Sequence, residues 1–174
     1  MKLLAEIFRD EGVNKEGKAV TRKAVRGIIV DQQKLLMIFS QKNGDYKFPG
    51  GGVNDGESNE MALIREVREE SGAEIRKVET GFGKVVEYAI PIEKEFDVFK
   101  MTSHYYVCEI EKELGKQQLD QYEEDLGFMP CWVRIDEALE TNRALLRENL
   151  QNAPRWTRRE TFVLEQIKTE LFGK

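Results

Sequence analysis

Cysteine, histidine and long apolar runs are all scarce in this 174-residue sequence, and each scarcity excludes a class of protein. The single histidine, His104, excludes a metal site built from several histidines. The two cysteines, Cys108 and Cys131, stand among apolar neighbours, which indicates reduced, buried thiols of a cytoplasmic protein. Met1 to Phe8 is too short for a signal peptide and carries Glu6, and no apolar run approaches the length of a membrane span. We therefore expect a cytoplasmic protein with no membrane partner.

Positive charge is also in short supply. The 27 Lys and Arg residues are outnumbered by 32 Asp and Glu, so the formal net charge is −5 at pH 7. This balance argues against a general binder of nucleic acids or of anionic membranes. It still allows a phosphate ligand, because bound metal ions reverse the sign of the local charge.

Glutamates at helical spacing are what the sequence does contain, in the stretch 51–73. If residues Glu57 to Ser71 form a helix, successive side chains turn by about 100°, and Glu66, Glu69 and Glu70 share one face. Gly72 is expected to end the helix in a left-handed conformation. Ala62 is expected on the acidic side, and the opposite face, packed on the core, is expected to consist of Met61, Leu63, Ile64 and Val67.

An acidic helix can also be a solvated one whose glutamates pair with Arg65 and Arg68. Two features favour a metal site instead. Like charges one turn apart cost a few tenths of a kcal/mol, which a counterion removes. The glycine run Gly50 to Gly52 suits close approach of a phosphate to the backbone. Because magnesium takes carboxylate, water and phosphate oxygens, we infer metal-assisted attack of water on a phosphoanhydride.

The same stretch, GGVNDGESNEMALIREVREESGA, resembles the Nudix box, G-x5-E-x7-R-E-U-x-E-E-x-G-U, where U is aliphatic. The preceding KFPGG also resembles that family. Ala73 is the one soft match, because it is small for an aliphatic position. The pattern falls on Gly51, Glu57, Arg65, Glu66, Val67, Glu69, Glu70, Gly72 and Ala73.

This resemblance implies roles for individual residues. Glu66, Glu69 and Glu70 are similar to the carboxylates that bind Mg²⁺ or Mn²⁺, and Glu66 is also similar to a position that serves as base or ligand. Arg65 would orient these glutamates by ion pairing, and Glu57 would support the junction of loop and helix. The three glycines of the turn, Gly50, Gly51 and Gly52, would let the backbone approach the diphosphate of the substrate.

Residues outside the box are weaker candidates. The polar segment 111–128 is either a solvated loop or the source of an extra ligand or general base, Glu123 or Glu124. Tyr46 and Phe48 would stack on a base or sugar, although core packing is the favoured alternative. His104 is expected to be a hydrogen-bonded sheet residue rather than a catalytic acid.

Strand and helix signals place the box in an α/β chain. Residues 1–10 suit a short helix, an edge strand or a dimer contact. Strands are expected at 21–30 and 34–40, paired as a hairpin, and at 75–90, 98–110 and 131–133. Asp136 is expected to cap a helix over 137–149, and Phe162, Val163, Ile167 and Leu171 indicate a last helix. This order predicts a mixed sheet between helices, and the resemblance implies a Nudix-like α/β/α sandwich. We expect one Nudix domain over 1–174, with an N-terminal extension at 1–20 and C-terminal helices at 136–174.

The predicted function is hydrolysis of the pyrophosphate bond in a nucleoside diphosphate linked to another group, with Mg²⁺ or Mn²⁺ as cofactor. Nucleotide sugars such as ADP-ribose, dinucleoside polyphosphates and nucleoside triphosphates are all open as substrates, and homodimerisation is open too. A catalytically silent nucleotide-binding regulator is one alternative, which the complete box argues against. An RNA-processing or RNA-binding protein is another, based on Arg155, Arg158 and Arg159 beside Trp156. These arginines are more simply explained by pairing with acidic groups.

Overall fold

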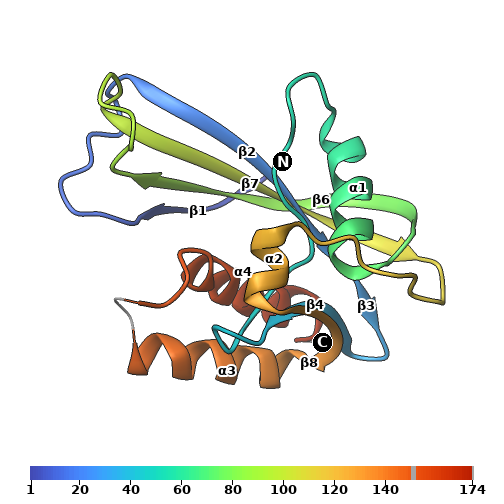
Figure 1. The fold of residues 1–174 in the computed structure, drawn as a ribbon. Coiled ribbons are helices and arrows are strands. Elements are labelled where there is room, and N and C mark those ends of the chain that lie inside the picture. The colour runs from blue at the N-terminus through green and yellow to red at the C-terminus, as the bar shows by residue number, and fades with distance from the viewer. Residues whose placement is uncertain (150–151, 174) are drawn as a thin grey trace.

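The computed structural model describes residues 1–149 and 152–173, which form two β-sheets between helices (Figure 1). The larger sheet has the strand order β1 (Leu3–Phe8), β6 (Ile75–Ala89), β7 (Val98–Ile110) and β2 (Ala19–Ile28). It is mixed, because β6 and β7 are antiparallel while β1 is parallel to β6 and β2 is parallel to β7. The predicted mixed sheet is therefore present.

The smaller sheet is antiparallel and is built on β4 (Lys34–Ser40). This strand pairs with β3 (Val30–Asp31), β5 (Asp45–Lys47) and β8 (Phe128–Arg134). Its central residues, Leu35 to Ile38, are all fully buried, so neither face of the strand meets water. Burying each such side chain contributes about 1.5–3 kcal/mol, which explains why this short apolar run holds the centre of the sheet.

Helices cover the sheets on both sides (Figure 1). On one side, α1 (Asn59–Ser71) buries Leu63 and Val67 against Val25 of β2. On the other, α3 (Ile135–Glu148) and α4 (Thr157–Leu171) share a core cluster with Ile28 of β2 and Leu35 of β4. A short helix, α2 (Gln121–Leu126), lies in the segment between β7 and β8. The α/β/α layering implied by the sequence resemblance is confirmed.

The structure decides what the sequence left open at the N-terminus and corrects the expected hairpin. Residues 3–8 form the edge strand β1, one of the three alternatives. The predicted pairing of strand 21–30 with strand 34–40 is wrong for most of its length. Only Val30 and Asp31 pair with β4, while β2 pairs with β7 along its whole length. The chain passes from the larger to the smaller sheet at Ile29. Local turn signals in the sequence do not specify which strand β2 pairs with.

Two helix predictions are also wrong. Met61 is 63% exposed, whereas Ala62, placed on the acidic side, is fully buried. The buried side of α1 is centred on positions 62, 63, 67 and 70, so it includes one of the glutamates. Asp136 does not cap α3, since Arg134 occupies the cap position; Asp136 lies in the first turn and pairs with Lys168 at 2.6 Å.

Both cysteines are free, and burial raises the pKa of the Cys108 thiol to about 12. Cys108 is buried as expected, whereas Cys131 is only partly buried. Across the described residues, none of the helices combines the length and apolarity that a membrane crossing requires.

Candidate active site

The glycine turn before α1 runs beside β2 and needs its glycines for close packing. Val25 N–H donates to Gly51 O at 2.9 Å, and Gly27 N–H donates to Pro49 O at 2.9 Å. Gly50 has φ of +140°, and a Cβ there would lie 2.1 Å from Val25 O. A Cβ at Gly51 would lie 2.1 Å from Glu66 Oε2. Gly50 therefore lets the turn approach β2, and Gly51 makes room for a carboxylate of α1.

Helix α1 ends at Gly72 as predicted, but it begins at Asn59 rather than at the expected Glu57. Ser58 at the N-cap accepts a hydrogen bond from Met61 N–H at 3.1 Å. At the other end Gly72 adopts φ of +71° and donates to Arg68 O. These two caps hold the register in which the glutamates of the helix face the glycine turn.

Arg65 joins the turn to the helix. Its guanidinium contacts Glu57 at 2.8 Å, Glu66 at 2.6 Å and Glu69 at 3.2 Å, and donates to Gly52 O at 3.0 Å. The hydrogen bond from Arg65, aided by Asn54 N–H, lowers the pKa of Glu57 to about 2. Arg65 thus makes the contacts that the resemblance implies for it.

Glu70 is the buried member of the set. It is 2% exposed, pairs with the ammonium of Lys47, and accepts a hydrogen bond from Gly50 N–H at 2.8 Å. Lys47 in turn lies 4.7 Å from the centre of the Phe128 ring. Because an unpaired buried carboxylate would be costly, these donors offset the cost of burying Glu70 under the glycine turn.

The structure adds Glu123 to this group. Ligand oxygens of Glu66, Glu70 and Glu123 all lie within 4.8 Å of one another. Glu123 is held by a capping box at the start of α2, in which Asp120 and Glu123 bond each other's backbone N–H at 3.0 and 2.9 Å. Burial raises the pKa of Glu123 to about 7 and also raises that of Glu66.

Three carboxylates this close, with oxygen the only donor type, suit a hard divalent cation. A cation there would offset both the burial and the mutual repulsion that disfavour their charged forms. Glu69 lies outside this group, because its carboxylate turns to Arg65 and is 32% exposed. Glu124 is exposed and also lies outside it. Of the two residues proposed from segment 111–128, the structure brings only Glu123 to the box.

Neither weak candidate for base stacking is placed to stack. Phe48 is fully buried and meets Tyr105 edge-on, with ring centres 5.7 Å apart. Tyr46 packs on Phe39 at 4.9 Å. This is the core packing that sequence analysis favoured. His104 is a half-buried residue of β7, and burial lowers its pKa.

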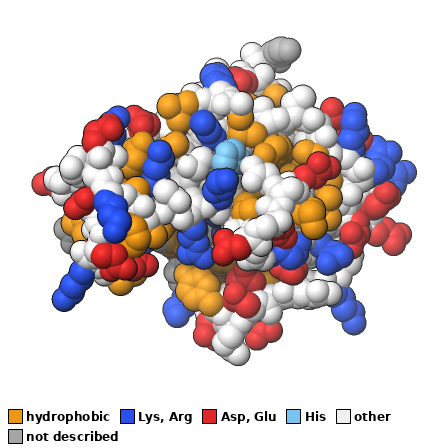
Figure 2. Space-filling model, turned by 90° about the horizontal axis from the view of Figure 1, so that it is seen from above, with side chains coloured by type: hydrophobic (Ala, Val, Ile, Leu, Met, Phe, Trp, Pro, Cys, Tyr) orange, Lys and Arg blue, Asp and Glu red, His pale blue; other side chains and the backbone are white. Residues whose placement is uncertain are grey.

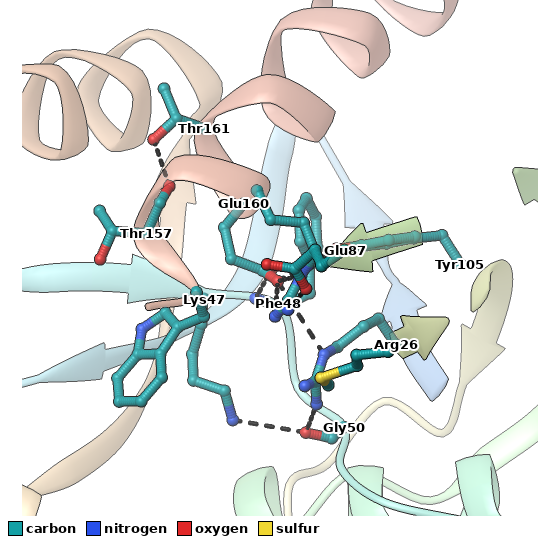
Figure 3. Close-up of polar contacts among 12 residues, drawn as sticks. Arg26, Lys47, Phe48, Gly50, Glu87, Tyr105, Thr157, Glu160 and Thr161 are labelled. Atoms are coloured by element: carbon teal, nitrogen blue, oxygen red, sulfur yellow. Dashed lines mark hydrogen bonds and ion pairs between the residues drawn. The ribbon is translucent and has the colours of Figure 1, made fainter. Parts of the chain in front are cut away.

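Behind the turn lies a buried polar network that sequence analysis missed (Figure 3). Glu160 of α4 accepts Phe48 N–H at 2.9 Å and the Tyr105 hydroxyl at 3.1 Å, and pairs with Arg159 at 2.7 Å. Arg26 lies 3.9 Å from Glu160 and donates to Gly50 O. The turn is therefore fixed from both sides, by α1 and by the C-terminal helix.

A sequence signal for this network did exist. Arg26 and Glu87 each interrupt an apolar strand, in AVRGII and VVEYA, where a lone charge requires a partner. Arg159 is wholly buried and pairs with Glu87 at 2.5 Å. The acidic pairing that sequence analysis favoured for Arg159 is therefore present, and its contact with RNA stays an untested alternative. On the face shown in Figure 2, basic and acidic side chains are intermixed.

A cavity of about 810 Å³ is lined by residues that neighbour the carboxylate group, although the three carboxylates themselves do not line it. Tyr122 and Leu126 of α2 contribute one wall, next to Glu123. Arg22 and Arg26 of β2 contribute another, next to the glycine turn. We call this the arginine-lined cavity, because its lining includes five arginines: Arg9, Arg22, Arg26, Arg155 and Arg159.

Comparison with known proteins identifies the family. The NUDIX domain family matches residues 20–156, most of the chain, so the chain belongs to the Nudix family. It is 43% identical over 63 residues to an ADP-ribose pyrophosphatase of Methanocaldococcus jannaschii, a match covering 34% of this chain and 37% of that protein. It is 32% identical over 91 residues to an RNA pyrophosphohydrolase of a Nitratiruptor species, covering 49% and 58%. The matches thus span only about a third to three fifths of these relatives.

Solved structures of low identity are similar too. The ORF135 protein of E. coli superposes with a TM-score of 0.49 at 22% identity, covering 77% of this chain and 95% of that one. A MutT Nudix hydrolase from Burkholderia pseudomallei gives 0.48 at 19% identity, covering 67% and 85%.

Proposed function

We propose that this protein hydrolyses the pyrophosphate bond of a nucleoside diphosphate derivative with the help of Mg²⁺ or Mn²⁺. The observation that carries the proposal is the grouping of Glu66, Glu70 and Glu123 within 4.8 Å of one another. The arginine-lined cavity supports it, because Tyr122 and Leu126 of α2, the helix of Glu123, line that cavity. Carboxylates suit the cation, and guanidinium groups suit the phosphates that the cation would also touch. The names of the two relatives make ADP-ribose and the 5′ end of RNA the first substrates to test.

The residues divide the work between binding and orientation. Glu66, Glu70 and Glu123 would hold the ion, which when bound polarises phosphate oxygens and acidifies water. Glu69 acts through Arg65, which fixes Glu66 against the glycine turn. Glu123 is either the third ligand or the acceptor of the proton of the attacking water.

The decisive test is turnover by the Glu70→Gln variant, with Glu60→Gln as matched control. Both changes remove one charge from α1, but Glu60 is exposed and lies outside the carboxylate group. We expect kcat to fall at least about 100-fold for Glu70→Gln and to stay within about twofold for Glu60→Gln. Purified protein would be assayed with saturating Mg²⁺ on nucleotide sugars, dinucleoside polyphosphates and nucleoside triphosphates. Turnover of Glu70→Gln near the wild-type rate would contradict the assignment.

Glu123→Gln separates the two roles left for Glu123. If Glu123 is a ligand, raising the Mg²⁺ concentration restores turnover. If it accepts the proton, kcat stays low at any Mg²⁺ concentration.

Location in the cytoplasm, homodimerisation and a single domain over 1–174 stay predictions.

A further inference from the structure

The arginine-lined cavity carries more positive charge than the fold itself uses. Its deepest arginines are partly neutralised: Arg9 pairs with Glu87 at 2.9 Å, and Arg159 pairs with both Glu87 and Glu160. Arg26 shares Glu160 at 3.9 Å. Three guanidinium groups therefore meet two carboxylates, and a positive charge is left over in a protein whose net charge is −5.

Arg26 also has an unused donor. Arg26 is 6% exposed, yet within residues 1–149 and 152–173 its Nε has no hydrogen-bond partner. A buried donor without a partner destabilises the folded protein. Since Arg26 lines the cavity beside the glycine turn, an acceptor on a bound ligand would remove this cost.

Two lining arginines, Arg22 and Arg155, are exposed and have no ion pair in the part of the chain that the structure describes. The Nη2 of Arg22 is 3.9 Å from where a Cβ on Gly52 would stand, so Arg22 lies near the glycine turn. A second cavity of about 370 Å³ shares Arg9 and Arg155 with the first; Arg22 does not line it, whereas Arg158, Asp10 and Glu87 do. Within the described residues, unpaired guanidinium groups therefore line the first cavity near the glycine turn and the second cavity at Arg155 and Arg158.

We propose that the substrate carries a phosphate group beyond the diphosphate that is cleaved, and that Arg155 and Arg158 bind it. This rests on the function proposed above. Arg22 and Arg26 face the diphosphate at the glycine turn, and the other pair receives the second phosphate. Guanidinium forks bind phosphate through paired hydrogen bonds, whereas a neutral sugar offers no charge to these two arginines. The chemistry is shared by a phosphate on a ribose and by a longer polyphosphate chain.

The test compares matched substrates. ADP-ribose would be assayed against its 2′-phosphate, its 1″-phosphate on the terminal ribose, and diadenosine tetraphosphate, at fixed salt and saturating Mg²⁺. We expect at least one phosphorylated substrate to have a kcat/KM at least tenfold above that of ADP-ribose, mainly through KM. Which of them is preferred identifies the position of the second phosphate.

Variants locate the effect. Arg155→Met with Arg158→Met should reduce the preference to about threefold or less. Arg76→Met is the control for loss of a surface arginine: it removes one positive charge from an exposed site on β6, paired with Glu109, and should keep the preference. A preference that survives in the double variant overturns the assignment of these arginines.

Other outcomes are equally clear. Equal or better turnover of ADP-ribose overturns the inference and leaves the proposed function intact. A 5′-triphosphorylated RNA also carries a further phosphate, so its preference over every small molecule supports the inference if the Arg155→Met, Arg158→Met variant loses that preference, and overturns it if the variant keeps it. If no substrate is turned over, the proposed function fails, and calorimetric binding of ADP-ribose and its phosphates still decides: tighter binding of a phosphorylated form by tenfold supports the inference, and equal binding overturns it.

Discussion

Two arginine-centred clusters meet at Gly50, and they differ in burial and in charge balance. In the Arg65 cluster, one arginine, 25% exposed, contacts three carboxylates: Glu57, Glu66 and Glu69. In the Arg159 cluster, three arginines meet two carboxylates: Arg9, Arg26, Arg159, Glu87 and Glu160. The Arg159 side chain is only 1% exposed. Gly50 lies between them: its N–H donates to Glu70, which lies beside Glu66 in the carboxylate group, and its carbonyl accepts from Arg26 of the Arg159 cluster.

This difference separates positions for a cation from positions for an anion. Surplus carboxylate on the α1 side leaves lone pairs for a metal ion, and the surplus guanidinium behind β2 leaves donors for phosphate. A phosphoanhydride bound by a metal needs both, one on each side. Burial also assigns the energetic roles: the Arg159 cluster is expected to dominate stability and the Arg65 cluster activity.

The largest expected effect is on folding, from Arg159→Met. Removing the arginine leaves Glu87 and Glu160 buried without their main partner, which costs about 3–5 kcal/mol. The unfolding free energy from urea titration measures it. Arg158→Met is the neighbouring control; Arg158 is exposed, so its loss should change stability by less than about 0.5 kcal/mol. A similar loss of unfolding free energy in Arg159→Met and Arg158→Met would contradict a dominant role of the Arg159 cluster in stability.

Acid should weaken the same cluster to a smaller extent. Burial alone would raise the pKa of Glu87, but Arg159 and Arg9 outweigh it and hold the pKa below its ordinary value of 4.5. Glu87 therefore contributes fully above pH 4.5, and its contribution is lost as the pH falls through its lowered value. In urea titrations from pH 7 to pH 3, the stability gap between wild type and Glu87→Gln should narrow at the acid end. A constant gap would mean that this pairing does not depend on the charge of Glu87.

The smallest expected effect sharpens the Arg65 side. Mg²⁺ or Mn²⁺ at ten times its Kd should stabilise the wild-type protein by about 1.4 kcal/mol, because it binds only the folded chain. Thermal unfolding with added metal, and again with excess EDTA, measures this. Glu66→Gln should lose most of the gain while Glu60→Gln keeps it. An equal gain in stability from added metal in Glu66→Gln and Glu60→Gln would mean that the ion binds elsewhere.

Much of the box geometry could be predicted from sequence, because it is local. A helix with a serine cap and a glycine end fixes its own register, so Glu66, Glu69 and Glu70 had to project within one turn of each other. Arg65 and Glu66 are neighbours on the same helix, and Glu57 lies in the short turn just before it, so the contacts of Arg65 with both are local too. Local geometry did not reveal which side of α1 would be buried, and Met61 was misplaced for that reason.

The sequence by itself determined the family, the acidic helix and the glycine turn, since each depends on residues close together in the chain. Only the tertiary structure decided which carboxylates converge. Glu123 reaches Glu66 and Glu70 from α2, and Glu160 reaches the turn from α4, more than 100 residues beyond Phe48. Such partners are chosen by the packing of sheets and helices, where burial forces each charge to find its counterpart. No spacing within the chain encodes that choice.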